Sequence, residues 1–568
     1  MSSSLVIGPL LRHVGRTSAT VWVEVAQRGT VRVTCGAVVV EAPTFEVAGH
    51  HYALAVLTGL PPGSRTPYAV DIDGRPVWPP ERGTARLFAE EAAPEQVPDP
   101  VITTLDAGDR RTIAFGSCRV ASPGRDTVDG DGTGGLGIDA LDAFAVRAAR
   151  GEGELPDLLL MLGDQVYADE TGDAVRERIR RRRGDSLPRH QVADFEEYTW
   201  LYRESWGDGP VRWLMATTPV AMIFDDHDVH DDWNTSASWR ADIARLPWWR
   251  ERLLGGLVSY WVYQHLGNLS PEELALDPVH RVVAAAAHDG SDAMPALREL
   301  AADADAAVGR REGGGYRFSF WRDLGVLRLV VLDSRCGRVL VDDDRDMLAD
   351  STFDWLQERL DDGGYRHLAI GTSVPWLLTP TLHAVEAWNE RSVARGGRRR
   401  VVGERLRRLV DLEHWAAFGS SFERLAAVLR AVGSREGAPR TVSVLSGDVH
   451  HSYVSRVDLG LPAGSPTRVH QLTCSPVHNL VPRVVRIGFT AAWSRPVGRI
   501  VTGLLHGALG VPRPTPTWQT LEGPVFGNCI ATLRVDGDAA DVVLETPVPQ
   551  SRRGADGALL RAVARRRL

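Results

Sequence analysis

The sequence predicts an α/β protein in which a small N-terminal β-sandwich precedes a layered αββα domain with helical insertions. Two changes of pattern indicate this fold. Short alternating apolar and polar runs fill residues 1–90, whereas apolar strand-like runs alternate with helical segments across residues 111–550. In addition, 568 residues are more than one hydrophobic core usually accommodates. We therefore expect more than one structural unit.

The N-terminal segment, 1–90, has the spacing of short antiparallel strands. Runs such as 19–25, 30–34 and 68–73 are separated by turn residues, among them the Pro-Pro-Gly of 61–63. This pattern predicts a sandwich of about immunoglobulin size. Residues 91–110 follow and are predicted to be a linker.

Apolar runs typical of strands buried on both faces mark the larger domain, 111–550. These runs are 112–115, 158–162, 220–224, 326–332, 367–370 and 441–445. Segments near 172–215, 236–312 and 383–432 carry helical periodicity and are predicted to be insertions that wall a site. Residues 551–568 are predicted to be a C-terminal tail or helix.

Composition limits the classes of function. The net charge of −8 and the pI near 6.1 argue against general nucleic-acid binding. No apolar run reaches the roughly 20 residues of a transmembrane helix. The stretch 497–511 is short and contains Arg499 and His506, so we expect a buried or docking helix there.

The cysteines and the N-terminal residues bear on the compartment. Five widely spaced cysteines do not describe a disulfide framework. The first residues lack a basic region followed by an apolar run, which a secretory signal would need. A cytoplasmic location is therefore expected.

Two clusters with metal-binding chemistry follow the first two apolar runs. Cys118 and Arg119 come directly after 112–115, where a thiolate can bind a transition metal, although a buried cysteine is often only core packing. Asp164 follows 158–162, and its carboxylate can offer one oxygen to each of two cations. Tyr167, three residues later, can direct its phenol to the same metal.

Two further clusters follow later runs. Residues 225–232 contain five carboxylates and two imidazoles directly after 220–224, and in an apolar setting these carboxylates would need cations to neutralise them. A solvated acidic loop is the alternative. Asp448 and His450 follow 441–445 and can project from one turn. Strand ends of this kind can collect along one edge of a layered sheet.

Taken together, these motifs resemble those of the PhoD-like (alkaline phosphatase D-like) branch of the calcineurin-like metallophosphoesterases. The superfamily's first, third and last motifs are replaced here by Gly116-Ser117-Cys118, by Asp225-Asp226-His227-Asp228 and by Gly447-Asp448-Val449-His450, as is typical of that branch. The segments 8–12 and 19–23 resemble its N-terminal domain, and 332–335 resembles a motif of its catalytic domain. The resemblance covers most of the chain.

The resemblance implies specific roles for these residues. Cys118, Asp164, Tyr167 and His450 would hold one metal, ferric iron, and Asp164 would bridge to a second ion. Asp226 and Asp448 would complete the second site, which the family implies to be calcium; other divalent ions such as Mn²⁺ or Zn²⁺ are alternatives.

Three further residues have implied catalytic roles. His227 would contact the phosphoryl or leaving-group oxygen. Arg119 and Arg335 would steady the non-bridging oxygens of the substrate or, equally, serve as structural ion-pair partners.

Two features depart from the family pattern. Many PhoD-like proteins carry a twin-arginine export signal, which the N-terminal residues here lack. Many superfamily members also have a lone metal-binding histidine before the last motif, whereas 371–376 occupies the comparable strand end here. Because this histidine is missing from that strand end, we expect the second metal to be held more loosely.

The sequence therefore predicts a phosphoesterase that hydrolyses phosphate monoesters or diesters through a metal-bound hydroxide. The expected substrate is a small-molecule or lipid-derived phosphate ester. Two alternatives remain open: a phospholipase-type phosphodiesterase, and a non-catalytic metal-stabilised protein whose β-sandwich binds a partner. The partner of the N-terminal domain is left open by the sequence.

Overall fold

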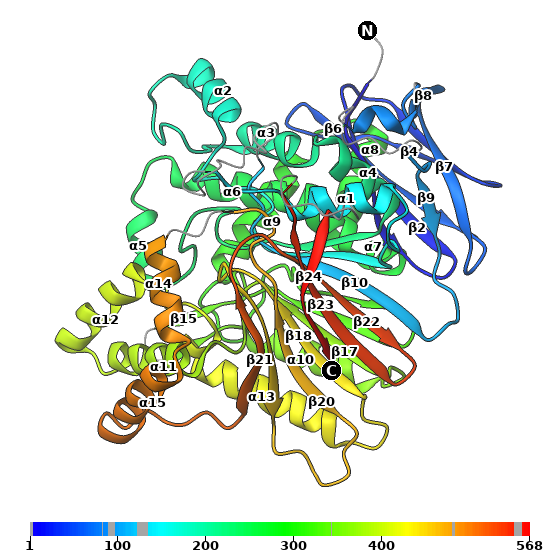
Figure 1. The fold of residues 1–568 in the computed structure, drawn as a ribbon. Coiled ribbons are helices and arrows are strands. Elements are labelled where there is room, and N and C mark those ends of the chain that lie inside the picture. Colours follow the sequence, from blue (N-terminus) through cyan, green and yellow to red (C-terminus); the bar gives the residue numbers. More distant parts are fainter. Residues whose placement is uncertain are drawn as a thin grey trace.

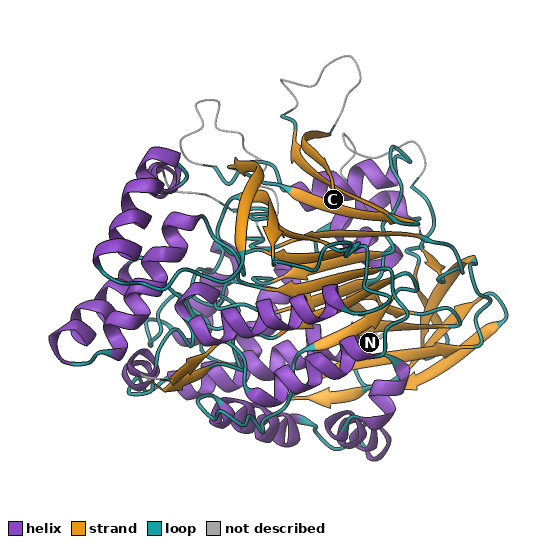
Figure 2. Ribbon diagram, turned by 90° about the horizontal axis from the view of Figure 1, so that it is seen from below, coloured by secondary structure: helices purple, strands orange, loops and turns teal. Residues whose placement is uncertain are grey.

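The computed structural model describes residues 4–81, 83–88, 97–121, 135–341, 344–479, 483–549 and 559–568. Strands lie at the centre of the molecule, and helices flank them on several sides (Figures 1 and 2). The N-terminal strands form a lobe at one side of the larger domain (Figure 1).

Two antiparallel sheets make up the N-terminal part. The first has the order β1 (Leu5–Val14), β2 (Ser18–Val25), β6 (His50–Thr58), β5 (Phe45–Val47), and the second β4 (Val38–Pro43), β3 (Thr30–Cys35), β7 (Arg65–Ile72), β8 (Arg75–Trp78). Alternate residues of both sheets, such as Leu11, Val21, Val33 and Val70, contribute to one buried cluster.

The predicted linker, 91–110, is partly a strand. β9 (Val101–Thr103) pairs with β7, and Val101 and Ile102 are buried, so these residues are held by sheet pairing. β10 (Arg110–Gly116) starts at the end of the same segment. Residues 91–96 lie outside the described part of the chain.

The larger domain contains two long sheets. One has the order β12 (Val220–Ile223), β11 (Leu158–Leu162), β10, β22 (Ile530–Asp536), β23 (Ala539–Pro547), β24 (Leu560–Arg567). The other has the order β13 (Phe320–Asp323), β14 (Leu327–Leu332), β17 (His367–Thr372), β18 (Thr441–Ser446), β20 (Arg468–Thr473), β19 (Ser452–Asp458), β21 (Thr517–Val525). In a separate two-stranded sheet, β15 (Val339–Val341) pairs antiparallel with β16 (Asp344–Asp346).

The prediction of a C-terminal tail or helix is wrong for the described residues of 551–568. Leu560–Arg567 form β24, an edge strand antiparallel to β23. Sheet pairing overrides the arginine-rich composition because the unpaired side of β23 accepts another strand, while most of the β24 side chains stay exposed.

Helices occupy the three ranges expected to contain insertions. The α-helices of the described chain are α1 (Ala140–Ala149), α2 (Asp173–Arg183), α3 (Phe195–Trp206), α4 (Gly209–Thr217), α5 (Ala237–Ile243), α6 (Trp249–Ser259), α7 (Pro271–Leu276), α8 (Pro278–Asp289), α9 (Met294–Ala307), α10 (Asp350–Asp361), α11 (Pro380–Ala394), α12 (Gly397–Leu409), α13 (Gly419–Ser434), α14 (Arg483–Ala492) and α15 (Arg495–Gly503).

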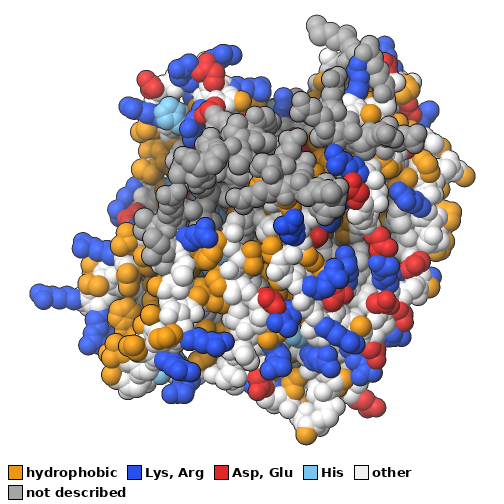
Figure 3. Space-filling model, in the orientation of Figure 1, with side chains coloured by type: hydrophobic (Ala, Val, Ile, Leu, Met, Phe, Trp, Pro, Cys, Tyr) orange, Lys and Arg blue, Asp and Glu red, His pale blue; other side chains and the backbone are white. Residues whose placement is uncertain are grey.

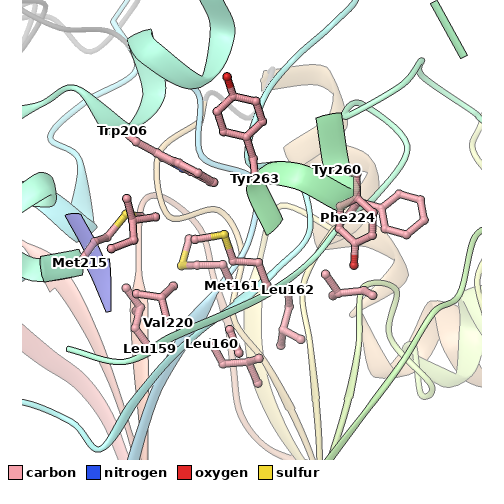
Figure 4. Close-up of a cluster of buried hydrophobic side chains, with 14 of the residues drawn as sticks. Leu159, Leu160, Met161, Leu162, Trp206, Met215, Val220, Phe224, Tyr260 and Tyr263 are labelled. Carbon is pink, nitrogen blue, oxygen red and sulfur yellow. The ribbon is translucent and has the colours of Figure 1, made fainter. Parts of the chain in front are cut away.

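The apolar strands pack on both faces. Leu329 and Val331 of β14 join the same buried cluster as β11, whereas Val330 and Leu332 join the cluster that contains α10 and α13. Figure 4 shows Met161 and Leu162 of β11 in the first cluster, with Trp206 on one side and Phe224 on the other. Side chains that alternate along each strand therefore tie the two long sheets and their covering helices together.

Two negative findings concern the described residues. Among them, no helix combines the length and the apolar character needed to span a bilayer. All five cysteines are buried and free of disulfide bonds, in agreement with the sequence pattern.

Candidate metal centre

The predicted ligands converge at one edge of the two long sheets. β10, β11 and β12 run parallel to one another, as do β14, β17, β18 and β20. The carboxyl ends of parallel strands meet at the same edge. The loops that follow β10, β11, β12 and β18 consequently bring Cys118, Asp164, Asp226 and Asp448 together.

Several of these residues have unusual backbone conformations. Cys118, Asp164, Asp448 and His450 have positive φ angles of 56°, 43°, 67° and 51°. Such angles are uncommon for residues with a Cβ and cost about 1–3 kcal/mol each, and they concentrate at functional sites. The fold therefore holds the side chains in directions that ordinary strand or helix geometry would not give.

Asp164 is shared by two groups of potential ligands. Ligand atoms of Cys118, Asp164 and Asp448 lie within 4.8 Å of one another, and so do those of Asp164, Asp225 and Asp226. A carboxylate common to two groups is what a bridge between two cations requires. The bridging role of Asp164 stays a prediction, and Asp225, which the sequence analysis did not select, belongs to one of the two groups.

Tyr167 and His450 both lie near Asn479. The Tyr167 hydroxyl is 3.3 Å from Asp164 Oδ2. Asn479, which follows β20, donates from Nδ2 to the Tyr167 oxygen at 3.0 Å, and the same atom is 3.5 Å from His450 Nε2. Tyr167 and His450 therefore converge, with Asn479 between them.

The raised pKa values of the buried carboxylates indicate a site that favours bound cations. Burial, followed by the neighbouring Asp226 and Asp225, raises the pKa of Asp164 well above its ordinary value, and burial likewise raises the pKa of Asp225. Within the described residues, Asp164 Oδ1 and Asp225 Oδ2 are buried without a hydrogen-bond partner. Cations at these oxygens would satisfy them and favour the ionised carboxylates.

The Cys118 thiol, like these carboxylates, is buried in surroundings that disfavour its ionised form. Burial raises the pKa of Cys118 well above its ordinary value, and the nearby Asp164 and Asp448 raise it further. Ser475, from the loop after β20, donates from its hydroxyl to the Cys118 sulfur at 3.3 Å. A transition-metal ion would supply the positive charge that a thiolate needs here.

His227 projects from the loop after β12 beside the same carboxylates. Its Nδ1 lies 3.0 Å from Asp169 Oδ1, and its ring centroid is 4.8 Å from that of Tyr167. Burial opposes the charged imidazole, but Asp169 and then Asp226 and Asp164 raise the pKa of His227 well above its ordinary value. The imidazole is thus oriented by Asp169 and able to carry a proton.

Arg335 is a fully buried ion-pair partner of these carboxylates. It donates from Nε to Asp225, its Nη2 is 3.1 Å from Asp226 Oδ1, and its Nη1 donates to Glu413 Oε2 at 2.7 Å. These contacts favour the structural alternative left open by the sequence.

Arg119 is also engaged by protein groups. It donates from Nε to Asp139 Oδ2 at 2.8 Å and from Nη1 to the Ser205 carbonyl at 2.7 Å. Its backbone N–H donates to the Asp164 carbonyl at 3.2 Å, which ties the loop after β10 to the loop after β11.

Asp448 has a histidine neighbour that the sequence analysis missed. His414 Nε2 is 3.3 Å from Asp448 Oδ2, and its Nδ1 is 2.6 Å from Glu386 Oε1. Although burial opposes ionisation, the bond to His414 leaves the pKa of Asp448 below its ordinary value. His414 lies in a helical insertion, between β17 and β18 in sequence, and not at the strand end 371–376 where such a histidine was sought.

The residues that the sequence analysis missed differ in how well a local sequence pattern marks them. Asp225 was visible as the first acidic residue after β12. Ser475 and Asn479 were detectable as polar residues beyond the end of the apolar strand β20, whereas His414 lies in a helical insertion and carries no local pattern.

Comparisons with known proteins agree with this geometry. The model of the PhoD-like phosphatase family matches residues 141–253, and the model of a domain of unknown function, DUF7800, matches residues 2–89. No curated protein matches the chain. The solved structure titled "Structure of PhoD" shares 13% sequence identity with a TM-score of 0.55, and the alignment covers 98% of this chain and 92% of that one.

Two other solved structures align with scores too low to bear on the fold. They are a type III pullulan hydrolase from Thermococcus kodakarensis, at 11% identity, 96% coverage of both chains and a TM-score of 0.16, and a maltogenic amylase from S. marinus, at 8% identity, 95% and 76% coverage and a TM-score of 0.15.

The likeness to PhoD extends over nearly the whole chain and confirms a mixed α/β fold with several sheets and many helices. The family match includes Asp164, Tyr167, Asp226 and His227, four of the residues that the structure brings to the sheet edge. The family match over residues 141–253 and the fold shared with PhoD together support a PhoD-like protein.

Proposed function

We propose that this protein hydrolyses phosphate monoesters and/or diesters at the edge of the two long sheets. The observation that carries the proposal is the position of Asp164 in two ligand groups, with Cys118 and Asp448 on one side and Asp225 and Asp226 on the other. A pair of adjacent cations is the arrangement that suits in-line attack on phosphorus, because both the attacking and the leaving oxygen can be stabilised.

The donor types suggest which ions would bind. Cys118, Tyr167 and His450 offer sulfur, phenolate and imidazole, which suit ferric iron, while Asp225 and Asp226 offer oxygens, which suit calcium. Asp448, which the sequence analysis assigned to the second ion, lies in the group with Cys118. When bound, the two ions would activate water and neutralise charge on the phosphoryl group.

The protein's own residues would then position and protonate the substrate. His227 is held by Asp169 and can donate a proton to the leaving oxygen. Arg335 fixes the orientation of Asp225 and Asp226, so we assign it a positioning role. Arg119, bound to Asp139, keeps the Cys118 loop against the Asp164 loop.

The decisive experiment compares substitutions of two aspartates that flank β11, one before the strand and one after it. Asp164→Asn should lose both metals and nearly all turnover of p-nitrophenyl phosphate and bis(p-nitrophenyl) phosphate, while its circular dichroism spectrum stays unchanged. Asp157→Asn is the matched control, because Asp157 accepts hydrogen bonds from Thr112 at the opposite end of β11. Near-parental metal content and activity in Asp164→Asn would remove the two-metal assignment.

A further inference from the structure

Two helices at the surface expose apolar side chains that the described fold does not use. On α15 and the turn that follows, Val497, Ile500, Leu504 and Leu509 are 40%, 73%, 57% and 44% exposed. On α12, Val401, Val402 and Leu409 are 53%, 63% and 77% exposed. Of the two expectations for 497–511, a buried helix or a docking helix, the exposed apolar side chains favour the second.

The inner face of each helix already has a packing partner in α11. Leu505 is buried and Val501 partly buried in a cluster with Ala384 of α11, and Gly498 lets α15 approach Thr381 closely. On α12, Gly403 accepts a hydrogen bond at its carbonyl from Asn389 of α11. Since the inner faces account for the packing, the outer apolar residues are free to contact something else.

The charge around this surface has one dominant sign. From Leu459 to Leu521 the sequence contains no Asp or Glu, although the whole chain has 73 of them and a net charge of −8. Arg398, Arg399, Arg405, Arg495 and Arg499 are exposed and form no ion pair within the described part of the chain. Figure 3 shows hydrophobic and basic side chains over the region of α11, α12 and α15, with acidic ones rare there.

We propose that the exposed sides of α12 and α15, the two helices that pack on α11, dock on an anionic phospholipid surface. Val497, Ile500 and Leu504 are spaced three and four residues apart and so share one side of the helix, as in helices that lie in a membrane interface. The exposed arginines complement the negative charge of the headgroups. A second copy of this protein would present the same positive charge, which makes it the less favoured partner.

The docking face is connected to the metal centre through α14. His451, next to the predicted ligand His450, accepts a hydrogen bond from Trp493 Nε1 at 3.2 Å, and its ring centroid lies 4.7 Å from that of Phe489. Only Trp493 and Ser494 separate the end of α14 from the start of α15. Docking would therefore bring lipid headgroups near the loop that carries Asp448 and His450.

Co-sedimentation of the full chain with vesicles tests this proposal. Vesicles of phosphatidylcholine mixed with phosphatidylglycerol should bind the protein, vesicles of phosphatidylcholine alone should not, and added salt should weaken the binding. The double substitution Ile500→Asp with Leu504→Asp should lower the bound fraction at least about tenfold. Arg495→Gln with Arg499→Gln should reduce binding to the anionic vesicles and its salt dependence.

Leu276→Asp is the matched control, because Leu276 is 77% exposed at the end of α7, on the other side of the molecule (Figure 1). Asp164→Asn should bind vesicles like the parent, so a failure of catalysis is distinguishable from a failure of docking. Absence of binding to anionic vesicles, or equal binding by the double variant, would overturn the proposal. A dimer in light scattering that Ile500→Asp with Leu504→Asp abolishes would assign the face to a second copy instead.

Discussion

Burying the carboxylates of the candidate metal centre costs free energy unless nearby positive charges compensate them. Asp164, Asp225 and Asp226 are buried within reach of one another, yet Arg335 supplies a cationic contact to two of them. Isolated buried carboxylates of this kind are strongly disfavoured. The remaining negative charge is best explained by cations, and the proposed roles of single residues can be separated by substitution.

His227 can be distinguished from a metal ligand. His227→Ala should leave metal content largely intact and lower kcat by about two to four powers of ten, as expected for a positioned proton donor. The measurement pairs turnover of p-nitrophenyl phosphate with elemental analysis of the same preparation. Loss of iron in His227→Ala would show that His227 is a ligand.

The purified protein should absorb visible light. A ferric ion bound by the Tyr167 phenolate or the Cys118 thiolate gives ligand-to-metal charge transfer. Tyr167→Phe should shift or weaken the band if the phenolate is the donor, and Cys118→Ser should do so if the thiolate is. A colourless, iron-free and fully active protein would mean that another metal occupies the site.

At the level of elements, the strand-to-loop junctions determine where the ligands point. β11 ends at Leu162, and Gly163 then adopts a φ of 114° before Asp164. A Cβ at Gly163 would lie 2.8 Å from the Cβ of Asp225. The junction therefore needs glycine both for its backbone conformation and for the close approach of two ligand loops.

Gly163→Ala should accordingly destabilise the protein by about 1–3 kcal/mol and weaken metal binding. Gly151→Ala is the matched control, since Gly151 has a φ of 69° but no atom within 4 Å of the added Cβ. The control should show a smaller loss of about 1 kcal/mol in denaturant unfolding, with metal affinity unchanged. Equal metal affinity in the two variants would contradict a positioning role for this junction.

At the level of the whole molecule, a histidine joins the N-terminal sheets to the larger domain. His50 of β6 lies 3.3 Å from Glu24 of β2 through Nδ1 and 2.7 Å from Glu196 of α3 through Nε2. Burial lowers the pKa of His50, but the bonds to Glu24 and Glu196 outweigh it and raise the pKa above its ordinary value. The charged imidazole therefore stabilises the contact between the two parts.

This contact should make stability depend on pH. Because the folded-state pKa of His50 is raised, its contribution is fully present below the unfolded pKa of about 6.5 and is lost as pH rises through the folded pKa. His50→Ala should lower Tm more at about pH 6 than at about pH 9. A loss of Tm that is the same at both values would show that the imidazole acts through packing alone.

The sequence by itself determined the mixed α/β fold and the residue types that gather at the candidate site. The candidate ligands were recognisable because strand runs and the polar residues after them are local patterns, as at Leu158–Leu162 and Asp164. Strands that run parallel then bring such ends to one edge, so the convergence of Cys118, Asp164 and Asp448 was predictable.

Only the tertiary structure decided which partners these residues have. Arg335 pairs with Asp225, His414 reaches Asp448 from a helical insertion, and Asn479 lies between Tyr167 and His450. The strand at Leu560–Arg567 and the exposed side of α15 were likewise not evident from local composition. Pairing and burial depend on groups distant in sequence, and a periodic pattern indicates that a face is apolar without showing what covers it.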